Sequence, residues 1–295
     1  MSQEAATLHL SSVIRHALLV ALVSLAMFTA QAGTRGQAPR ASRPTAPTSD
    51  LLLHSPLVRC APGAGAARSQ SKALRVATWN IRAALSAPVD ELAAELRSMK
   101  ADIAGLQEVD FRARRSGLTE QAPALATALA AHYVFAASIE YDGGDYGLAL
   151  LSNWPLVEVR RHRLDPVGVG EPRIVLEVIV CASGRPLRVF NHHADVGSRS
   201  RESGFARLRE LVAPHVGAGV VVLGDFNDAP AAPGIRALLA LGLVDIGAEQ
   251  NAPTSGGGRI DYLLLDAPLA KRARSTQVWP TRKSDHHALI TEFDW

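Results

Sequence analysis

Apolar positions along residues 73–295 follow two different periods. In 88–100, Leu92, Leu96 and Met99 recur at the spacing of one helix face, whereas 219–223 is a wholly apolar run of strand length. The other segments divide in the same way. The predicted helices are 88–100, 121–131, 200–214 and 234–241, and the predicted strands are 74–81, 102–109, 133–141, 147–154, 157–164, 173–180, 186–194, 219–223, 259–265, 275–279 and 288–293.

The order of these elements indicates the fold class. Strands outnumber helices and follow one another in hairpin-like runs, with no regular strand–helix alternation. Such runs favour an α+β architecture of two packed sheets with helices on the outside. We therefore expect one layered domain over residues 73–295.

The N-terminal segment has the features of an export signal. Arg15 and His16 precede an apolar stretch at 17–30, and Ala30-Gln31-Ala32 fits a small-residue cleavage site. The stretch is short for a membrane span, which needs about 20 residues. We expect 1–32 to be a signal peptide and the protein to be periplasmic or secreted. An uncleaved membrane anchor is the alternative.

Residues 33–72 are rich in Ala, Pro, Gly, Ser, Thr and Arg, and only the patch 51–53 is apolar. This composition predicts a disordered linker before the catalytic domain. Cys60 lies in the linker and Cys181 at a predicted strand end. An exported protein can hold a disulfide, but a flexible linker gives little reason for one. We expect two unpaired cysteines, too few for a cysteine-rich metal site.

The charge is unevenly distributed. The whole chain carries +3 with a pI near 9.1, but residues 73–295 contain 24 Lys/Arg against 26 Asp/Glu. The predicted domain is therefore not basic, and the pI does not indicate nucleic-acid binding. Clustered arginines such as Arg199, Arg201, Arg207 and Arg209 fit either a phosphate-facing rim or a solvated helix surface.

Six polar clusters stand out, and nearly all of them follow an apolar, strand-like run. They are Thr78-Trp79-Asn80, Leu106-Gln107-Glu108-Val109, Asn191-His192-His193, Gly224-Asp225-Phe226-Asn227, Arg259-Ile260-Asp261-Tyr262 and Ser284-Asp285-His286. Several strands would thus deliver carboxylates and imidazoles to one cleft. Hard cations take carboxylate oxygens, and phosphoester hydrolysis needs charge neutralisation and a positioned water. The clusters therefore indicate metal-assisted phosphoester chemistry.

These motifs, with Gly147-Leu148-Ala149-Leu150-Leu151-Ser152, resemble those of the endonuclease/exonuclease/phosphatase superfamily in order and rough spacing. The resemblance covers about residues 74–295. It implies a four-layered α/β sandwich with the active site at one edge of two facing sheets. It also implies a single Mg²⁺, with Mn²⁺ as a possible substitute.

The resemblance assigns roles to individual positions. Glu108, Asn80 and Asp285 correspond to the metal-binding residues. Asp225 corresponds to the residue that activates the attacking water, and Asn227 to the donor to the scissile phosphate. His286 would contact the phosphate, and Asp261 would pair with His286.

Four positions are less closely matched. His193 is the expected cleft histidine, with His192 as the alternative, because strand alternation lets only one face the cleft. Glu171 resembles the glutamate that orients this histidine. His287 and Arg82 are candidate substrate contacts. Arg82 stands where abasic-site endonucleases carry an acidic residue, and Leu148 replaces a common Asn.

The substrate stays open among three phosphoester classes. The net charge of the predicted domain does not favour a nuclease. A phospholipid or sphingomyelin phosphodiesterase would need exposed apolar loops at the cleft. An inositol- or sugar-phosphate monoesterase would need converging cations such as Arg82, Arg173 and Lys283. A non-catalytic phospholigand-binding domain is the remote alternative, since none of the matched catalytic positions is missing. We expect a monomer with no obligate protein partner.

Overall fold

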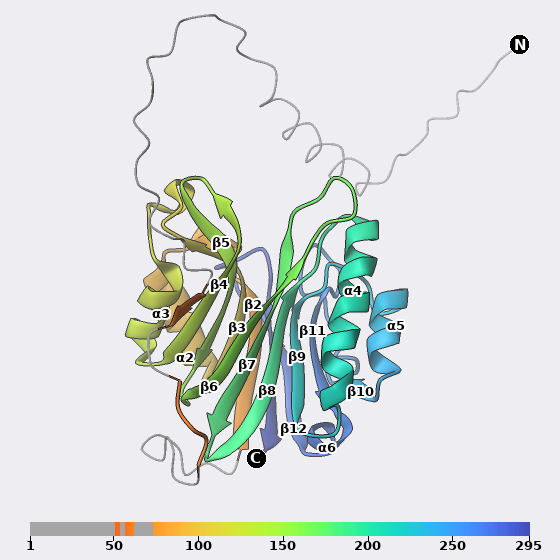
Figure 1. Ribbon diagram of the computed structural model, residues 1–295. Helices are drawn as coiled ribbons and strands as arrows, with labels where there is room; N and C mark the ends of the chain where they lie inside the picture. The colour runs from red at the N-terminus through yellow and green to blue at the C-terminus, as the bar shows by residue number, and fades with distance from the viewer. Residues whose placement is uncertain (1–50, 54–56, 62–72) are drawn as a thin grey trace, which may run out of the picture. The chain divides into compact units, whose positions relative to one another are not determined.

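The computed structural model describes residues 51–53, 57–61 and 73–295, which belong to one compact unit, Ser49–Trp295. Their strands form two sheets (Figure 1). The first sheet has the order β1 (Leu51–Leu53), β4 (His132–Tyr141), β5 (Gly144–Ser152), β3 (Ile103–Phe111), β2 (Ala73–Asn80), β13 (Ala288–Asp294) and β12 (Ala273–Trp279). The second has the order β10 (Leu243–Asp245), β11 (Asp261–Asp266), β9 (Val220–Asp225), β8 (Arg185–His193), β7 (Arg173–Ala182) and β6 (Leu156–Leu164).

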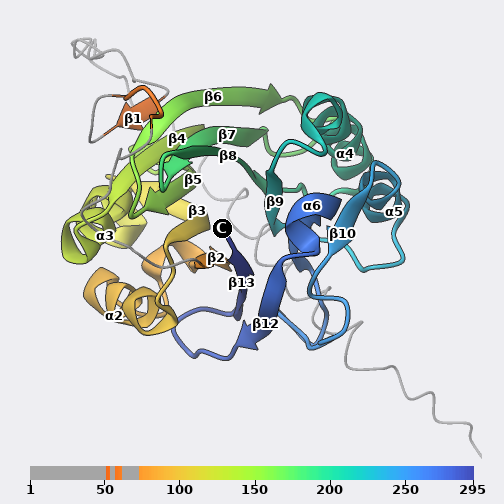
Figure 2. The same cartoon turned by 90° about the horizontal axis from the view of Figure 1, so that it is seen from below.

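Helices cover the outer face of each sheet, so the unit has four layers (Figure 2). Helices α2 (Val89–Met99) and α3 (Gln121–Leu129) pack on the first sheet, and α4 (Ser198–Val212) and α5 (Pro233–Leu239) pack on the second. A third apolar core, which includes Ile103, Val178 and Leu263, lies between the sheets. The short helix α6 (Ala267–Ala270) follows β11. The predicted α+β sandwich is confirmed.

Helix α2 illustrates how the sequence specifies these elements. Leu92, Leu96 and Met99 are buried at the predicted helical spacing. Asp90 and Glu91 lie in the first turn, where their charges favour the positive end of the helix dipole. The helix ends at Lys100, whose backbone is left-handed with φ of 54°. The buried apolar spacing, the acidic first turn and the left-handed residue at the C-terminal end thus all support a helix over this segment.

The topology places the predicted site residues at one edge of the sandwich. Strands β2 and β3 are parallel, as are β8 and β9, so their carboxyl ends point the same way. Strands β5, β7, β11 and β13 run antiparallel to them and therefore begin at that edge. We call this edge the site edge; in Figure 1 it is the upper end of the strands. Across the second sheet, Asp225 is in register with His193 and with Asp261.

Two expectations for residues 33–72 were wrong where this segment is described. Leu51–Leu53 forms β1, which pairs antiparallel with β4, so the apolar patch extends the sheet instead of lying in a disordered linker. Cys60 and Cys181 form a disulfide, and the Val58 amide donates to the Leu156 carbonyl at 3.0 Å. The segment before the domain is thus held against β6 and β7, which brings the two sulfurs together. The rest of 33–72 lies outside the described residues.

The expected signal peptide, 1–32, also lies outside the described residues. Within the part of the chain that the structure describes, no helix has the length and apolar character needed to cross a membrane.

Candidate active site

A β-bulge places Glu108. Between the pairs Leu106–Ala149 and Val109–Gly147, two residues of β3 oppose one of β5. Glu108 adopts a left-handed backbone with φ of 53°, which costs a non-glycine residue about 1–3 kcal/mol. Such bulges redirect side chains and are frequent beside active sites. The half-buried Glu108 accepts a hydrogen bond from Asn80 Nδ2 at 2.9 Å.

Asp225 is the centre of the cluster. The Nδ2 atom of Asn80 also donates to Asp225 Oδ2 at 3.1 Å, so the amide of Asn80 bridges Glu108 in one sheet and Asp225 in the other. The Asn227 backbone N–H donates to Asp225 Oδ1 at 2.9 Å. Burial raises the pKa of Asp225 to about 7, as does the charge of Asp261, while the charge of His286 opposes the rise.

His286 and Asp261 form a buried pair. The Nδ1 atom of His286 lies 2.9 Å from Asp261 Oδ2, and its Nε2 atom faces Asp225 Oδ2 at 3.7 Å. Burial alone would lower the pKa of His286, but the hydrogen bond and charge of Asp261 outweigh it and raise the pKa to about 9. The raised pKa favours the cationic form of His286 at neutral pH. Its backbone carbonyl accepts a hydrogen bond from Trp79 Nε1, which holds the loop.

The structure separates the two adjacent histidines. His193 faces the cleft, with Nε2 at 3.5 Å from Asp225 Oδ2. His192 points the opposite way and packs edge-on against Phe205 and Phe226 in the core beneath α4. Burial lowers the pKa of both rings, that of His192 to about 4 and that of His193 well below its usual value. His193 is therefore the histidine of this cluster.

The remaining predicted residues lie around this cluster. Asn227, also left-handed with φ of 48°, donates from Nδ2 to the Ala194 carbonyl at 3.0 Å. Asp285 is about half exposed, and its Oδ2 lies 3.4 Å from Arg82 Nε. Arg82 begins a turn of three left-handed residues, and its backbone N–H donates to Asn80 Oδ1 at 3.0 Å.

Two predicted residues, Glu171 and His287, have partners in the structure that the sequence did not indicate. Glu171 pairs with Arg173 at 2.8 Å, and it is Arg173 NH1 that lies 3.2 Å from His193 Nδ1. Arg173 thus lies between Glu171 and the histidine that Glu171 was expected to orient. His287 Nδ1 accepts the Thr281 backbone N–H at 3.2 Å. This hydrogen bond ties its ring to a local turn, and its contact with a substrate stays a prediction.

Of the three residues predicted to hold a metal, Glu108 and Asp285 offer carboxylates that suit a hard cation, whereas both ends of the Asn80 amide have hydrogen-bond partners. Among the described residues, the one hydrogen bond to the Glu108 carboxylate comes from Asn80, so lone pairs remain for coordination. Asp285 adds a second carboxylate, and its half-exposed ion pair with Arg82 contributes little energy and can exchange. Carboxylate oxygens are the ligands that Mg²⁺ prefers. The donor set at this edge therefore fits that ion.

A second group of ligand-type atoms comprises Asp225, Asp261 and His286, which lie within 4.8 Å of one another. A protonated imidazole has no lone pair for a metal. The hydrogen bond between His286 Nδ1 and Asp261 Oδ2 and the raised pKa of His286 favour a hydrogen-bonded network in this triad.

The sequence did not predict the roles of two supporting residues, Asn191 and Thr254, although Asn191 lies in one of the six polar clusters. Asn191 ties the sheets together beneath the cluster, because its Oδ1 accepts from Gln107 Nε2 at 2.7 Å and its Nδ2 donates to the Leu106 carbonyl at 3.0 Å. The Thr254 hydroxyl accepts the Asp261 backbone N–H at 3.1 Å. Threonines and asparagines are too common for either role to be found by motif.

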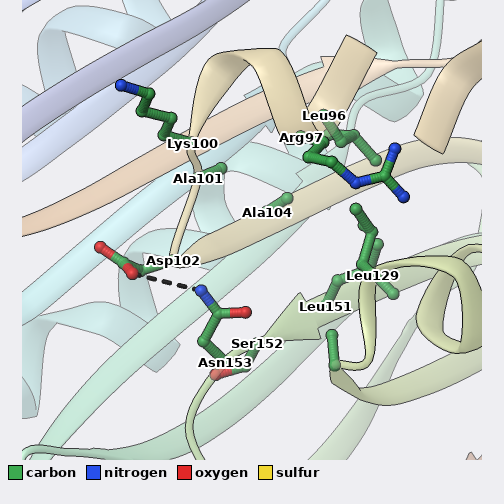
Figure 3. Close-up of a pocket in the computed structure, with 11 residues that line it drawn as sticks. Leu96, Arg97, Lys100, Ala101, Asp102, Ala104, Leu129, Leu151, Ser152 and Asn153 are labelled. Atoms are coloured by element: carbon green, nitrogen blue, oxygen red, sulfur yellow. Dashed lines mark hydrogen bonds between the residues drawn. The ribbon is translucent and has the colours of Figure 1, made fainter. Parts of the chain in front are cut away.

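A cavity of about 370 Å³ lies away from this cluster, at the opposite end of β3 (Figure 3). It is lined by the ends of α2 and α3 and by Asp102 and Asn153, which share a hydrogen bond of 3.2 Å. It contains none of the predicted site residues.

Comparison with known proteins identifies the family. The sequence profile of the Endonuclease/Exonuclease/phosphatase family matches residues 77–286, so the chain belongs to this family. Its members hydrolyse phosphoester bonds and generally depend on divalent metals. A search of curated protein sequences found no significant match.

Solved structures share the fold. A mannosyl-6-phosphatase from Bacteroides thetaiotaomicron is 19% identical, with a TM-score of 0.59 over 74% of this chain and 98% of its own. An AP endonuclease from Archaeoglobus fulgidus is 20% identical, with a TM-score of 0.59 over 75% and 100%. The catalytic domain of human Nocturnin is 22% identical, with a TM-score of 0.60 over 75% and 94%. At these identities the likeness establishes the fold alone.

Proposed function

We propose that this protein is an exported, Mg²⁺-dependent phosphoester hydrolase that works by in-line attack of water. The observation that carries the proposal is the meeting of Asn80, Glu108, His193, Asp225 and His286 at one edge of the sandwich. Export is supported by the Cys60–Cys181 disulfide, because disulfides persist chiefly in oxidising compartments.

Each residue has a defined task in this proposal. Asp225, with its pKa raised to about 7, accepts a proton from the attacking water near neutral pH. His286, kept cationic by Asp261, donates to a phosphate oxygen as negative charge develops there. His193 donates a second hydrogen bond. Glu108 and Asp285 would hold the Mg²⁺, which supplies Lewis-acid neutralisation of the phosphate charge.

The task of Asn80 follows from its two hydrogen bonds. Its amide group reaches Glu108 and Asp225 together, so it fixes the metal-binding carboxylate relative to the general base. Asn227 presents its backbone N–H to Asp225, and its side chain is held at the Ala194 carbonyl. We therefore assign Asn227 first to orienting Asp225. A donation to phosphate would require its amide to leave that carbonyl.

A substrate panel on the full chain tests the proposal. Plasmid DNA, RNA, sphingomyelin, phosphatidylinositol and inositol phosphates are assayed with Mg²⁺, Mn²⁺ or EDTA. We expect metal-dependent turnover that is lost in Asp225→Asn and retained in Asp228→Asn, a matched change at a residue that pairs with Arg201 at 2.9 Å instead of entering the cluster. A folded, metal-binding protein without turnover on any substrate would favour a binding role.

A phospholipid or sphingolipid diester is the substrate class with a specific observation in its favour. Six of the eight large apolar side chains that are exposed among the described residues lie at the site edge. They are Leu85, Leu118, Tyr141, Val167, Val169 and Val196. Exposed apolar side chains around a site favour a lipid surface. Turnover of sphingomyelin in vesicles, with none of inositol phosphates, would support this class. The opposite result would exclude it.

A further inference from the structure

Arg173, the first residue of β7, makes an unusual contact for this cluster. Its NH1 atom lies 3.2 Å from Nδ1 of His193. An arginine side chain has only donors and stays charged at all physiological pH values. Nδ1 of His193 must therefore be the acceptor, without a proton. An imidazole with a bare Nδ1 is neutral and carries its single hydrogen on Nε2.

Arg173 has partners besides the ring, although its buried Nε atom has no hydrogen-bond partner among the described residues. Its side chain is only 10% exposed, and NH1 also lies 2.8 Å from the Glu171 carboxylate. Tyr146, at the start of β5, lies beside it, and the negative charge of Asp195 acts on it as well. A guanidinium fixed from several sides can orient a neighbouring ring with little loss of entropy.

The surroundings of His193 agree with a neutral ring. Burial, the positive charge of Arg173 and the neighbouring His192 and His286 all lower the pKa of His193. Asp225 is the group that faces it with negative charge, at 3.5 Å from Nε2. A hydrogen on Nε2 would point toward Asp225 and the cleft, where it could be donated to an acceptor atom.

We propose that Arg173 is a positioning residue that fixes His193 as the neutral, Nε2-protonated ring. His193 then acts as a hydrogen-bond donor into the cleft and takes no part in proton transfer. The assignment of a phosphate oxygen as its acceptor rests on the proposed function, but the position of the ring proton does not.

The role has a consequence for Asp225. Without Arg173, burial and the neighbouring histidines would still oppose a second proton on His193, but the Asp225 carboxylate at 3.5 Å would favour it with one opposing charge fewer. The resulting imidazolium–carboxylate pair would occupy Asp225 and weaken it as a base. Arg173 therefore prevents a competing ion pair at the centre of the site.

Nitrogen NMR of the ¹⁵N-histidine-labelled full chain tests the proposal, with His193→Gln to assign the resonances. We expect an unprotonated Nδ1 and a protonated Nε2 in the wild type from roughly pH 6 to 9, the range that spans the usual histidine pKa. Arg173→Met should let the ring take up a second proton as the pH falls. Its kcat should drop about tenfold more at pH 6 than at pH 8. Arg173→Lys, which keeps a charged donor, should restore the neutral ring.

Arg75→Met is the matched control. Arg75 is also a partly buried arginine in an ion pair, at 2.7 Å from Glu292, but it lies toward the other end of the strands. The Arg75→Met variant should be less stable than the wild type, and its His193 spectrum should be unchanged. A proton on Nδ1 in the wild type would overturn the proposal, as would an Arg173→Met spectrum like that of the control. If Arg173→Met does not fold, the wild-type and Arg173→Lys spectra decide.

The two proposals fail in different ways. A wild type without turnover but with a bare Nδ1 would refute the proposed function and support the role of Arg173. An active wild type with a proton on Nδ1 would support the proposed function and refute the role of Arg173.

Discussion

The disulfide between Cys60 and Cys181 should contribute a large part of the stability of this domain. The bridge joins positions 121 residues apart. In the chain-entropy model, closing a loop of this length stabilises the folded state by about 4.9 kcal/mol at 25 °C. Cys60→Ser breaks the bridge with little change in packing, because Cys60 is partly exposed, whereas Cys181 is fully buried and its thiol packs well as a small apolar group.

For a domain of this size, about 1 kcal/mol corresponds to roughly 2–4 °C in Tm, so Cys60→Ser should melt about 10–20 °C below the wild type. Calorimetry without and with reductant measures this. Reductant should bring the wild type down to the variant and leave the variant unchanged. Turnover at 25 °C should be retained, because Cys181 lies near the end of β7 and Arg173 lies at its start, beside the cluster.

A Tm difference below about 3 °C would refute the entropic argument, since it would mean that the unfolded chain gains little freedom when the bridge is lost. An unchanged melting curve of the wild type in reductant, with the thiols shown to be free, would refute it equally. Loss of turnover in a folded variant would show that the segment 57–61 acts on the site edge.

Other predictions concern the site directly. Asp225→Asn should lower kcat by about 10² or more, whereas Asp228→Asn should leave it near the wild-type value; a loss below threefold in Asp225→Asn would remove this residue from the mechanism. Activity should rise as the pH passes about 7, where Asp225 loses its proton, and fall above about 9, where His286 loses its own. A profile that is flat across this range would contradict both assignments. EDTA should abolish turnover, and added Mg²⁺ should restore it. The Glu108→Gln variant should need an Mg²⁺ concentration about tenfold higher or more for half-maximal activity. Equal metal dependence in Glu108→Gln and the wild type would place the metal elsewhere.

Several non-glycine residues at the site edge have a left-handed backbone, and only some of them belong to the motifs. Glu108 and Asn227 have positive φ, as do Arg82, Ala83 and Ala84 in the turn that follows Asn80. A left-handed conformation costs an L-residue about 1–2 kcal/mol, so these positions are maintained by their surroundings. For Glu108 the compensating contact is the hydrogen bond from Asn80, and for Arg82 it is the bond from its N–H to Asn80 Oδ1. Asn80 therefore stabilises the geometry of the site as well as lying in it.

Local sequence patterns were sufficient for the longer elements and for the family. Alternation and helical spacing depend on near neighbours, and so do the short motifs at the strand ends. The same patterns predicted the two-sheet sandwich. They did not reveal β10 or α6, which are too short to show a period, or β1, whose apolar patch is separated from the domain by polar residues.

The sequence by itself thus determined that carboxylates and imidazoles lie at or beside the termini of strands in an α+β sandwich, and that only one of His192 and His193 can face the cleft. The tertiary structure decided that it is His193, through the register of β8 beside Asp225 in β9. It also decided that Arg173, rather than Glu171, contacts that ring. These outcomes depend on strand register and on side chains brought together by folding, which no local pattern encodes. The disulfide follows the same rule, since its cysteines are 121 residues apart and meet only where the segment before the domain lies against β6 and β7.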